Sequence, residues 1–272
     1  MTIKLIAVDM DGTFLDDAKS YNRPRFMALY QRMKHQGIRF AVASGNQYWQ
    51  LRSFFPEIAH EMGFVAENGA WVLCGDRDLF NGAFSHEQLR RIIGVLLQLP
   101  DVEIVVCGKR SAWTLSHYRD EVKQAAAHYY PRLEQVDDFA GIESHDTFFK
   151  FALNLPDATL AQTMAWLCDT LGDIVTPVTS GHGSIDLIIP GLHKAHGLDL
   201  LRRHWNIDSG KVLAFGDGGN DTEMLQQADF GFAMANAPGV VQALTPHRAP
   251  DNNQEGVLEI IERALNHAPP FD

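Results

Sequence analysis

Cysteine is scarce in this sequence. The 272 residues include three cysteines, at positions 74, 107 and 168, and no Cys-x-x-Cys pair. An odd number of scattered cysteines is a poor basis for a disulfide framework or a zinc knot, and it is typical of proteins of a reducing cytoplasm. We therefore expect the three thiols to be small buried apolar side chains, and the protein to be cytoplasmic.

Positive charge and long apolar runs are also scarce. Lys and Arg number 23 against 34 Asp and Glu, which gives a formal net charge of −11. An acidic chain lacks the basic face that nucleic acids and anionic membranes require, so neither is an expected partner. No apolar stretch approaches the roughly 18 residues that cross a bilayer, and we expect neither a membrane span nor a signal peptide. No pattern in the sequence indicates an oligomeric state.

What the chain does contain is a series of short apolar runs, each followed by Gly, Asp or Ser. Continuous hydrophobicity over a few residues is typical of strands in a parallel sheet that is covered on both faces. Such runs occupy residues 3–8, 38–43, 63–66, 211–215 and 230–234. Helical patterns alternate with them at 22–36, 194–205, 220–228 and 254–266. This alternation predicts a doubly wound, mostly parallel α/β fold.

The middle of the chain has a different pattern. Strand-like segments joined by short turns alternate with helices, which predicts an antiparallel sheet with helices packed on it. The strand-like segments are 102–107, 112–116, 149–155 and 184–190, and the helical ones are 85–99, 118–130 and 157–171. We therefore predict a discontinuous α/β core, residues 1–82 and 190–272, with an inserted α+β cap domain at residues 83–189.

The strongest chemical signal is Asp9-Met10-Asp11-Gly12-Thr13, directly after the first predicted strand. Residues two apart in an extended chain point the same way, so we expect both carboxylates to converge beyond the end of the strand, where open α/β sheets bind ligands. Two close carboxylates repel each other unless a cation or a shared proton relieves them, and hard oxygen ligands favour Mg²⁺. The alternative is a solvated acidic turn.

Two further polar segments follow predicted strands. Ser44-Gly45-Asn46 offers a hydroxyl and free amides that suit an anionic oxygen, although an ordinary helix N-cap explains it equally well. The segment 216–221 is Gly-Asp-Gly-Gly-Asn-Asp, in which Asp217 and Asp221 offer two more carboxylates for a metal ion. The alternative for this second segment is a glycine-rich turn with a capping aspartate.

Lys194 lies at the start of a predicted helix. A cation is disfavoured at this positive end of the helix dipole, so the position is easier to explain if Lys194 faces a phosphate and a group of carboxylates. The alternative is an exposed lysine on a solvated surface. His193 and His196 flank it at a spacing that can bind a metal, but the nearby aspartates favour Mg²⁺ over zinc.

In chain order the motifs are Asp-x-Asp, Ser, Lys and Asp-x-x-x-Asp, and together they suit phosphoryl transfer. This set resembles the haloacid dehalogenase (HAD) superfamily, and the long insertion between the Ser and Lys motifs resembles the cap of its Cof-type group. The resemblance implies a Rossmann-like core and a Mg²⁺-dependent phosphatase. Its substrates are expected to be small phosphorylated metabolites, in particular sugar phosphates.

The resemblance also implies a role for each motif residue. Asp9 is the expected nucleophile, and Asp11 is the expected general acid and base. Mg²⁺ is expected on the Asp9 carboxylate, the Asp11 backbone carbonyl and Asp217, with Asp221 in support. The phosphoryl oxygens are expected to contact Ser44, Gly45, Lys194, Asn220 and Thr13. The leaving group is expected to contact Asn46, the turn 179–183 and Asp186.

Other functions are compatible with parts of this pattern. A phosphomutase or phosphotransferase of the same superfamily would carry the same motifs. A catalytically silent binding protein would be expected to have lost Asp9, Asp11 or Lys194, and all three are present. A nucleotide-binding dehydrogenase is excluded, because no Gly-x-Gly-x-x-Gly follows the first predicted strand.

Overall fold

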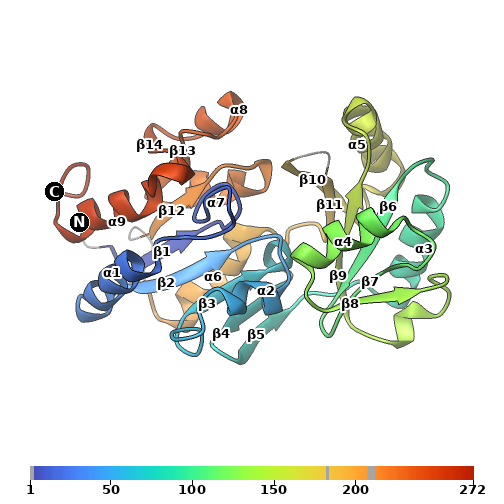
Figure 1. The fold of residues 1–272 in the computed structure, drawn as a ribbon, viewed down its shortest axis with the longest axis horizontal. Coiled ribbons are helices and arrows are strands. Elements are labelled where there is room, and N and C mark those ends of the chain that lie inside the picture. Colours follow the sequence, from blue (N-terminus) through green and yellow to red (C-terminus); the bar gives the residue numbers. More distant parts are fainter. Residues whose placement is uncertain (1–2, 182–183, 208–211) are drawn as a thin grey trace.

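The structure, a computed structural model, describes residues 3–181, 184–207 and 212–272, which form two β-sheets side by side (Figure 1). The order of the eight-stranded sheet is β14 (His247–Ala249), β13 (Phe230–Met234), β12 (Val212–Gly216), β1 (Leu5–Val8), β2 (Arg39–Ala43), β3 (Gly63–Ala66), β4 (Trp71–Cys74) and β5 (Arg77–Asn81). The order of the six-stranded sheet is β10 (Thr176–Gly181), β11 (Ser184–Ile188), β9 (Phe148–Asn154), β6 (Glu103–Gly108), β7 (Ala112–Leu115) and β8 (Leu133–Val136).

The eight-stranded sheet is built from both ends of the chain, and β1 lies inside it. β1 pairs in parallel with β12 on one side and with β2 on the other, so that Leu5 is level with Val212 and with Arg39. All five predicted apolar runs form strands here, and the mostly parallel α/β prediction is confirmed. The antiparallel hairpin β4–β5 was not predicted: β4 is a short apolar run, but β5 carries exposed polar residues and has no such run.

Helices cover both faces of this sheet. α1 (Arg23–His35), α2 (Tyr48–Ser53) and α9 (Gly256–Leu265) pack on the face that contains Ile6 and Val8. α6 (Lys194–His204) and α7 (Thr222–Gln227) pack on the opposite face, which contains Leu5 and Ala7, and a short helix, α8 (Gly239–Gln242), follows β13. Burial on both faces explains why the strands read as unbroken apolar runs.

The six-stranded sheet is covered on one face by α3 (His86–Leu96) and α5 (Asp157–Leu171), while α4 (Asp120–Tyr129) connects β7 to β8. Its strand pairs are antiparallel except for β7–β8, which is parallel. We call residues 83–189 the cap and the two flanking parts the core. These limits are the predicted ones, and the division into two domains stays a prediction.

The open face of the cap sheet lies against the core (Figure 1). Phe149 of β9 stacks on Trp71 of β4 with ring centroids 5.5 Å apart. The Arg132 guanidinium lies 3.3 Å from the ring centroid of Trp49, and the Gln47 side chain exchanges two hydrogen bonds with the Arg132 backbone. The cap is therefore closed on the core.

The cysteine prediction is correct for one residue of three. All three thiols are free, but only Cys107 is buried, whereas Cys74 is half-buried and Cys168 is exposed. Cys168 lies on α5, where its neighbour Leu167 and, one turn on, Leu171 face the cap sheet, so the thiol points outward. No helix within the described ranges is both long enough and apolar enough to cross a bilayer.

Candidate active site

The predicted motifs meet at one edge of the core sheet. β1, β2 and β12 are parallel and adjacent, so their carboxyl ends lie together, and Asp9, Ser44 and Asp217 each follow one of these ends. Lys194 is the first residue of α6, which packs on the same sheet. This edge is where open α/β sheets bind ligands, as the sequence predicted.

Lys194 is buried between two carboxylates. Its side chain is 1% exposed, and its Nζ donates to Asp9 Oδ1 and to Asp221 Oδ1, each at 2.6 Å. Burial alone would lower the pKa of this ammonium, but Asp221 and Asp9 raise it above its ordinary value. Lys194 is therefore charged and fixed in place, and the alternative of an exposed surface lysine is wrong.

Asp9, Asp217 and Asp221 form an excess of negative charge around that single cation. One carboxylate oxygen from each lies within 4.8 Å of the others. Burial raises the pKa of Asp9 well above its ordinary value, with Lys194 opposing it. Burial and the neighbouring Asp221 raise the pKa of Asp217 to about 6. An all-oxygen donor set whose negative charge is under-compensated fits a hard divalent cation such as Mg²⁺.

The backbone at Gly12 makes room for this group. Gly12 has φ +74°, and a Cβ there would lie 2.4 Å from Asp217 Oδ2. Thr13 donates its hydroxyl to Asp217 Oδ1 at 2.7 Å, so in this structure Thr13 orients a carboxylate. The sequence prediction gave Thr13 a contact to a phosphoryl oxygen, and the structure adds this second contact.

Asp221 fixes the loop that precedes it. Its Oδ2 accepts hydrogen bonds from the backbone N–H groups of Asp217 and Gly218, both at 2.9 Å, while its Oδ1 accepts from Lys194. The residue is fully buried, and a buried carboxylate needs such partners. Its contacts therefore fix the position of Lys194 relative to the Asp217 backbone.

The Asp11 carboxylate has two partners of its own outside this group. It accepts from Lys19 Nζ and from Asn46 Nδ2, both at 2.6 Å, and its side chain is 30% exposed. The Asp9 carboxylate contacts Lys194 instead, so the two carboxylates have different partners on either side of the turn that follows β1, and their convergence on one site stays a prediction. Phe14 and Leu15 both donate their N–H to the Met10 carbonyl, which forms a tight turn. Each aspartate therefore has its own lysine.

The Ser44 segment is a turn between β2 and α2 and does not cap a helix. α2 begins at Tyr48 with Gln47 before it, while the buried Ser44 Oγ accepts from the Asn46 N–H at 3.1 Å. Gly45 lies close to the cap, since a Cβ there would be 2.9 Å from Asp186 Oδ2. The N-cap alternative is therefore wrong, and the turn lies at the carboxyl end of β2.

Two residues that sequence reasoning missed belong to this site. Lys19, the partner of Asp11, lies in a loop with φ +57°, and no sequence pattern marked it. Asn68 lies just after β3, in the same way that the predicted motifs follow their strands. This position and the Asn-Gly pair were the features of the sequence that could have identified it. Asn68 is 1% exposed, and its backbone has φ +55°. Asn68 Oδ1 accepts from Asn220 Nδ2 at 3.1 Å.

A cavity of about 220 Å³ lies between core and cap beside these asparagines. Its core lining is Asn68, Gly191, His193, Asn220 and Glu223, and its cap lining is Thr176, Val178 and Ile188. His193 Nδ1 accepts from the His196 N–H at 3.2 Å at the start of α6. Of the predicted leaving-group turn 179–183, residues 182 and 183 lie outside the described residues.

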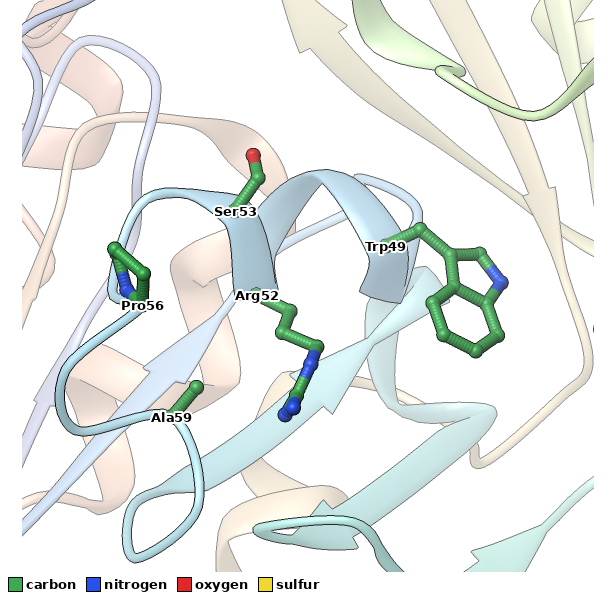
Figure 2. Close-up of a pocket in the computed structure, with 5 residues that line it drawn as sticks. All are labelled: Trp49, Arg52, Ser53, Pro56 and Ala59. Carbon is green, nitrogen blue, oxygen red and sulfur yellow. The ribbon is translucent and has the colours of Figure 1, made fainter.

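A second hollow, of about 330 Å³, lies on the outer side of α2 and the segment after it (Figure 2). Trp49, Arg52, Ser53, Pro56 and Ala59 line it, and none of these is a predicted site residue. The catalytic edge and this hollow are therefore separate.

Comparison with known proteins identifies the family. The model of the haloacid dehalogenase-like hydrolases matches residues 6–261, which is most of the chain. The chain belongs to this family. This match confirms the resemblance to HAD proteins and the α/β fold. Together with the phosphatases among its relatives, it also confirms the prediction that the protein is an enzyme, a phosphoric monoester hydrolase.

Three relatives place this HAD hydrolase more closely. It is 58% identical to the 5-amino-6-(5-phospho-D-ribitylamino)uracil phosphatase YbjI of Escherichia coli, over all of both chains. It is 26% identical to an HMP-PP phosphatase of Cronobacter sakazakii, over 90% of this chain and 88% of that one. The solved structure of SMU.1108c from Streptococcus mutans superposes with a TM-score of 0.93 at 36% identity, covering 97% of this chain and 100% of that one.

Proposed function

We propose that this HAD hydrolase is a Mg²⁺-dependent phosphatase of small sugar or polyol phosphates that forms an aspartyl-phosphate on Asp9. The observation that carries the proposal is the buried group at the end of β1, in which Asp9 contacts Lys194 at 2.6 Å within 4.8 Å of Asp217 and Asp221. A nucleophile fixed beside a cation is suited to attack an anionic phosphate.

Asp9 carries out the first step. One carboxylate oxygen attacks phosphorus in line with the leaving oxygen, so that a bond from Asp9 to phosphorus forms as the ester bond breaks. Lys194 holds the other carboxylate oxygen and keeps the attacking group oriented. The phosphoryl group is then on Asp9, and the leaving group departs as an alcohol.

Asp11 handles the protons in both steps. It gives its proton to the leaving alkoxide in the first step, and as a carboxylate it takes a proton from the water that attacks the phosphorus of the aspartyl-phosphate. The second step releases inorganic phosphate and returns Asp9 and Asp11 to their starting forms. Contacts from Lys19 and Asn46 hold the Asp11 carboxylate, which is 30% exposed and so stays accessible to water.

Mg²⁺ would be held by the Asp9 carboxylate, the Asp11 backbone carbonyl and Asp217, and when bound it neutralises charge on the phosphoryl oxygens. Thr13 orients Asp217 for this role, and Asp221 holds the Asp217 backbone. The remaining donors are the Ser44 hydroxyl, the Gly45 amide, Lys194 and the Asn220 amide. We propose that these contact the phosphoryl oxygens, which carry the charge in the transition state.

The cap–core cavity supports a small substrate. Its volume of about 220 Å³ lies below the range of typical drug-sized ligand pockets, and its lining combines amides, Glu223 and His193 with the apolar Val178 and Ile188. The E. coli relative is named for a phosphorylated ribityl chain on a uracil ring. We propose that this chain accepts phosphate esters of that kind, in the cytoplasm, with Asn46 at the ester.

The proposal is tested by measuring phosphate release from a panel of monoesters with Mg²⁺ and with EDTA. The panel should contain hexose and pentose phosphates, sugar alcohol phosphates and 5-amino-6-(5-phospho-D-ribitylamino)uracil. We expect turnover that EDTA abolishes and excess Mg²⁺ restores. Stoichiometric transfer to an added sugar without phosphate release would replace the phosphatase with a phosphotransferase, and no turnover on any ester would overturn the proposal.

A further inference from the structure

A second buried ionic group lies where the cap meets the core. Lys150 of β9 is 2% exposed and lies 3.1 Å from Asp186 Oδ2 of β11 and 3.7 Å from Glu67 Oε2 of the core. Tyr130 of the cap completes the group, since Lys150 Nζ lies 3.3 Å from its hydroxyl. Two strands of the cap sheet and one loop of the core therefore bury their charged groups against each other.

Asn68 connects this group to the catalytic loops. Its backbone N–H donates to the Ser44 carbonyl at 3.0 Å, and its Oδ1 accepts from Asn220 Nδ2 at 3.1 Å. Its Nδ2 donates to Asp186 Oδ2 at 2.7 Å. Asn68 thus contacts two loops that we place around the phosphoryl group, and it contacts the cap through one carboxylate.

We propose that Asn68 is a positioning residue that aligns the Ser44 and Asn220 loops only when the cap closes and presents Asp186 to it. The inference rests on the proposed function, because alignment matters only if these loops hold the phosphoryl group. It differs from the role that family resemblance gave to Asp186, which was a contact to the leaving group. In this structure Asp186 Oδ2 is already shared by Lys150 and Asn68.

The cost of burying Asp186 favours one position of the cap on the core. Closure removes Asp186 from water, leaving it 3% exposed, and a buried carboxylate is tolerated only when donors replace the lost water. Lys150 belongs to the cap and stays beside Asp186 in any cap position, since β9 and β11 are paired. The donor supplied by the core is Asn68. A cap displaced by one hydrogen-bond length would leave the Asn68 amide unpaired and Asp186 with Lys150 as its remaining charged partner, so closure has one favoured position.

Alignment of Asn220 follows from the same contact. An amide whose Nδ2 is fixed on Asp186 has its Oδ1 directed to one place, where it accepts from Asn220. When the cap is open, the Asn68 side chain loses that constraint. The phosphate donors are then fully assembled only over a bound substrate, which limits wasteful reaction with water.

The experiment is an exchange of the two partners. Asn68→Asp keeps an acceptor for Asn220 but places a carboxylate against Asp186, and Asp186→Asn removes the charge that Asn68 contacts. The double variant, Asn68→Asp with Asp186→Asn, restores one amide and one carboxylate in reversed order. We expect kcat/KM for p-nitrophenyl phosphate with Mg²⁺ to fall about 10- to 100-fold in each single variant, mainly in kcat, as expected for a lost buried hydrogen bond.

The double variant is the decisive test. We expect its kcat/KM to be at least about tenfold higher than that of the less active single variant. Asn154→Asp is the matched control: the same substitution faces Glu103 at an exposed position of the cap sheet, and it should leave kcat/KM unchanged. Circular dichroism and thermal unfolding of all variants, measured without substrate, give a readout independent of catalysis. A non-additive thermal shift in the double variant would establish the contact itself.

Single variants with wild-type kcat and KM would overturn the inference, and so would single variants impaired to the same extent as the double variant. In both cases the wild type still hydrolyses the ester, so the proposed function stands. If the wild type shows no Mg²⁺-dependent turnover, the proposed function fails, and the inference fails with it.

Discussion

Two buried lysines, Lys194 in the core and Lys150 in the cap, each lie beside two carboxylates, but at different distances. Lys194 lies 2.6 Å from each of two carboxylates, and a third carboxylate lies beside them. Lys150 lies 3.1 and 3.7 Å from its two carboxylates. For both lysines, burial opposes the charge and the carboxylates raise the pKa above its ordinary value.

The difference is in what the surplus negative charge can do. In the core group the surplus lies at an open sheet edge, where a divalent cation and a phosphate can complete it. Around Lys150, where the cap meets the core, burial raises the pKa of Glu67 to about 7 even though Lys150 opposes it, so a proton on Glu67 can offset the surplus there. We therefore propose that the group around Lys194 binds and reacts, whereas the group around Lys150 fixes the position of the cap on the core.

Removing the nucleophile should have the largest effect. Asp9→Asn keeps the shape of the core group but deletes the attacking oxygen, so we expect phosphate release to fall at least about 10³-fold. Asp169→Asn, at an exposed position of α5, is the control and should retain wild-type turnover. Activity within tenfold of wild type would show that Asp9 is not the nucleophile.

Replacing each lysine by methionine compares the two groups directly. Breaking a buried pair leaves uncompensated charge, so each variant should lose about 3–5 kcal/mol of unfolding free energy in urea titrations without Mg²⁺. Because a bound cation replaces the missing charge at the core site only, Mg²⁺ should restore stability to Lys194→Met and not to Lys150→Met. Equal responses to Mg²⁺ would erase the distinction between the two groups.

The pH dependence of stability should report on Glu67. Its folded pKa of about 7 lies above the ordinary value of 4.5, so the folded protein holds this proton more tightly than the unfolded chain does. The resulting stabilisation is complete below pH 4.5 and is lost as the pH rises through 7, by up to about 3 kcal/mol. Glu67→Gln keeps the neutral form, so its stability relative to wild type should increase from pH 5 to pH 8. Parallel profiles would contradict this.

Mg²⁺ binding should stabilise the folded protein through the core group. At about 100 times its dissociation constant, a ligand that binds only the folded state adds about 2.7 kcal/mol, which is measurable as a rise in melting temperature. Asp217→Asn removes one of the proposed ligands and should lose most of that rise, whereas Asp173→Asn, on the exposed surface of the cap, should keep it. A full response in Asp217→Asn would exclude Asp217 as a ligand.

Much of the fold was predictable, because a strand that is buried on both faces appears in the sequence as an unbroken apolar run. The residues of β3 and β13 match the predicted runs 63–66 and 230–234, and α5 matches 157–171. The hairpin β4–β5 and the strand β8 were missed, since β5 and β8 carry exposed polar residues and lack such runs. The Cys168 prediction failed because a step of one residue turns a side chain by about 100° around a helix, which takes Cys168 from the sheet-facing side of Leu167 to solvent.

Sequence alone determined which residues come to the catalytic edge. Asp9, Ser44 and Asp217 each follow a buried strand, and parallel neighbouring strands must end at the same place, so local pattern was sufficient. Only the tertiary structure decided that Asp11 pairs with Lys19, and that Asn68 of the core meets Asp186 of the cap. Those contacts depend on a tight turn and on the position in which one sheet docks on another, and neither leaves a periodic signal along the chain.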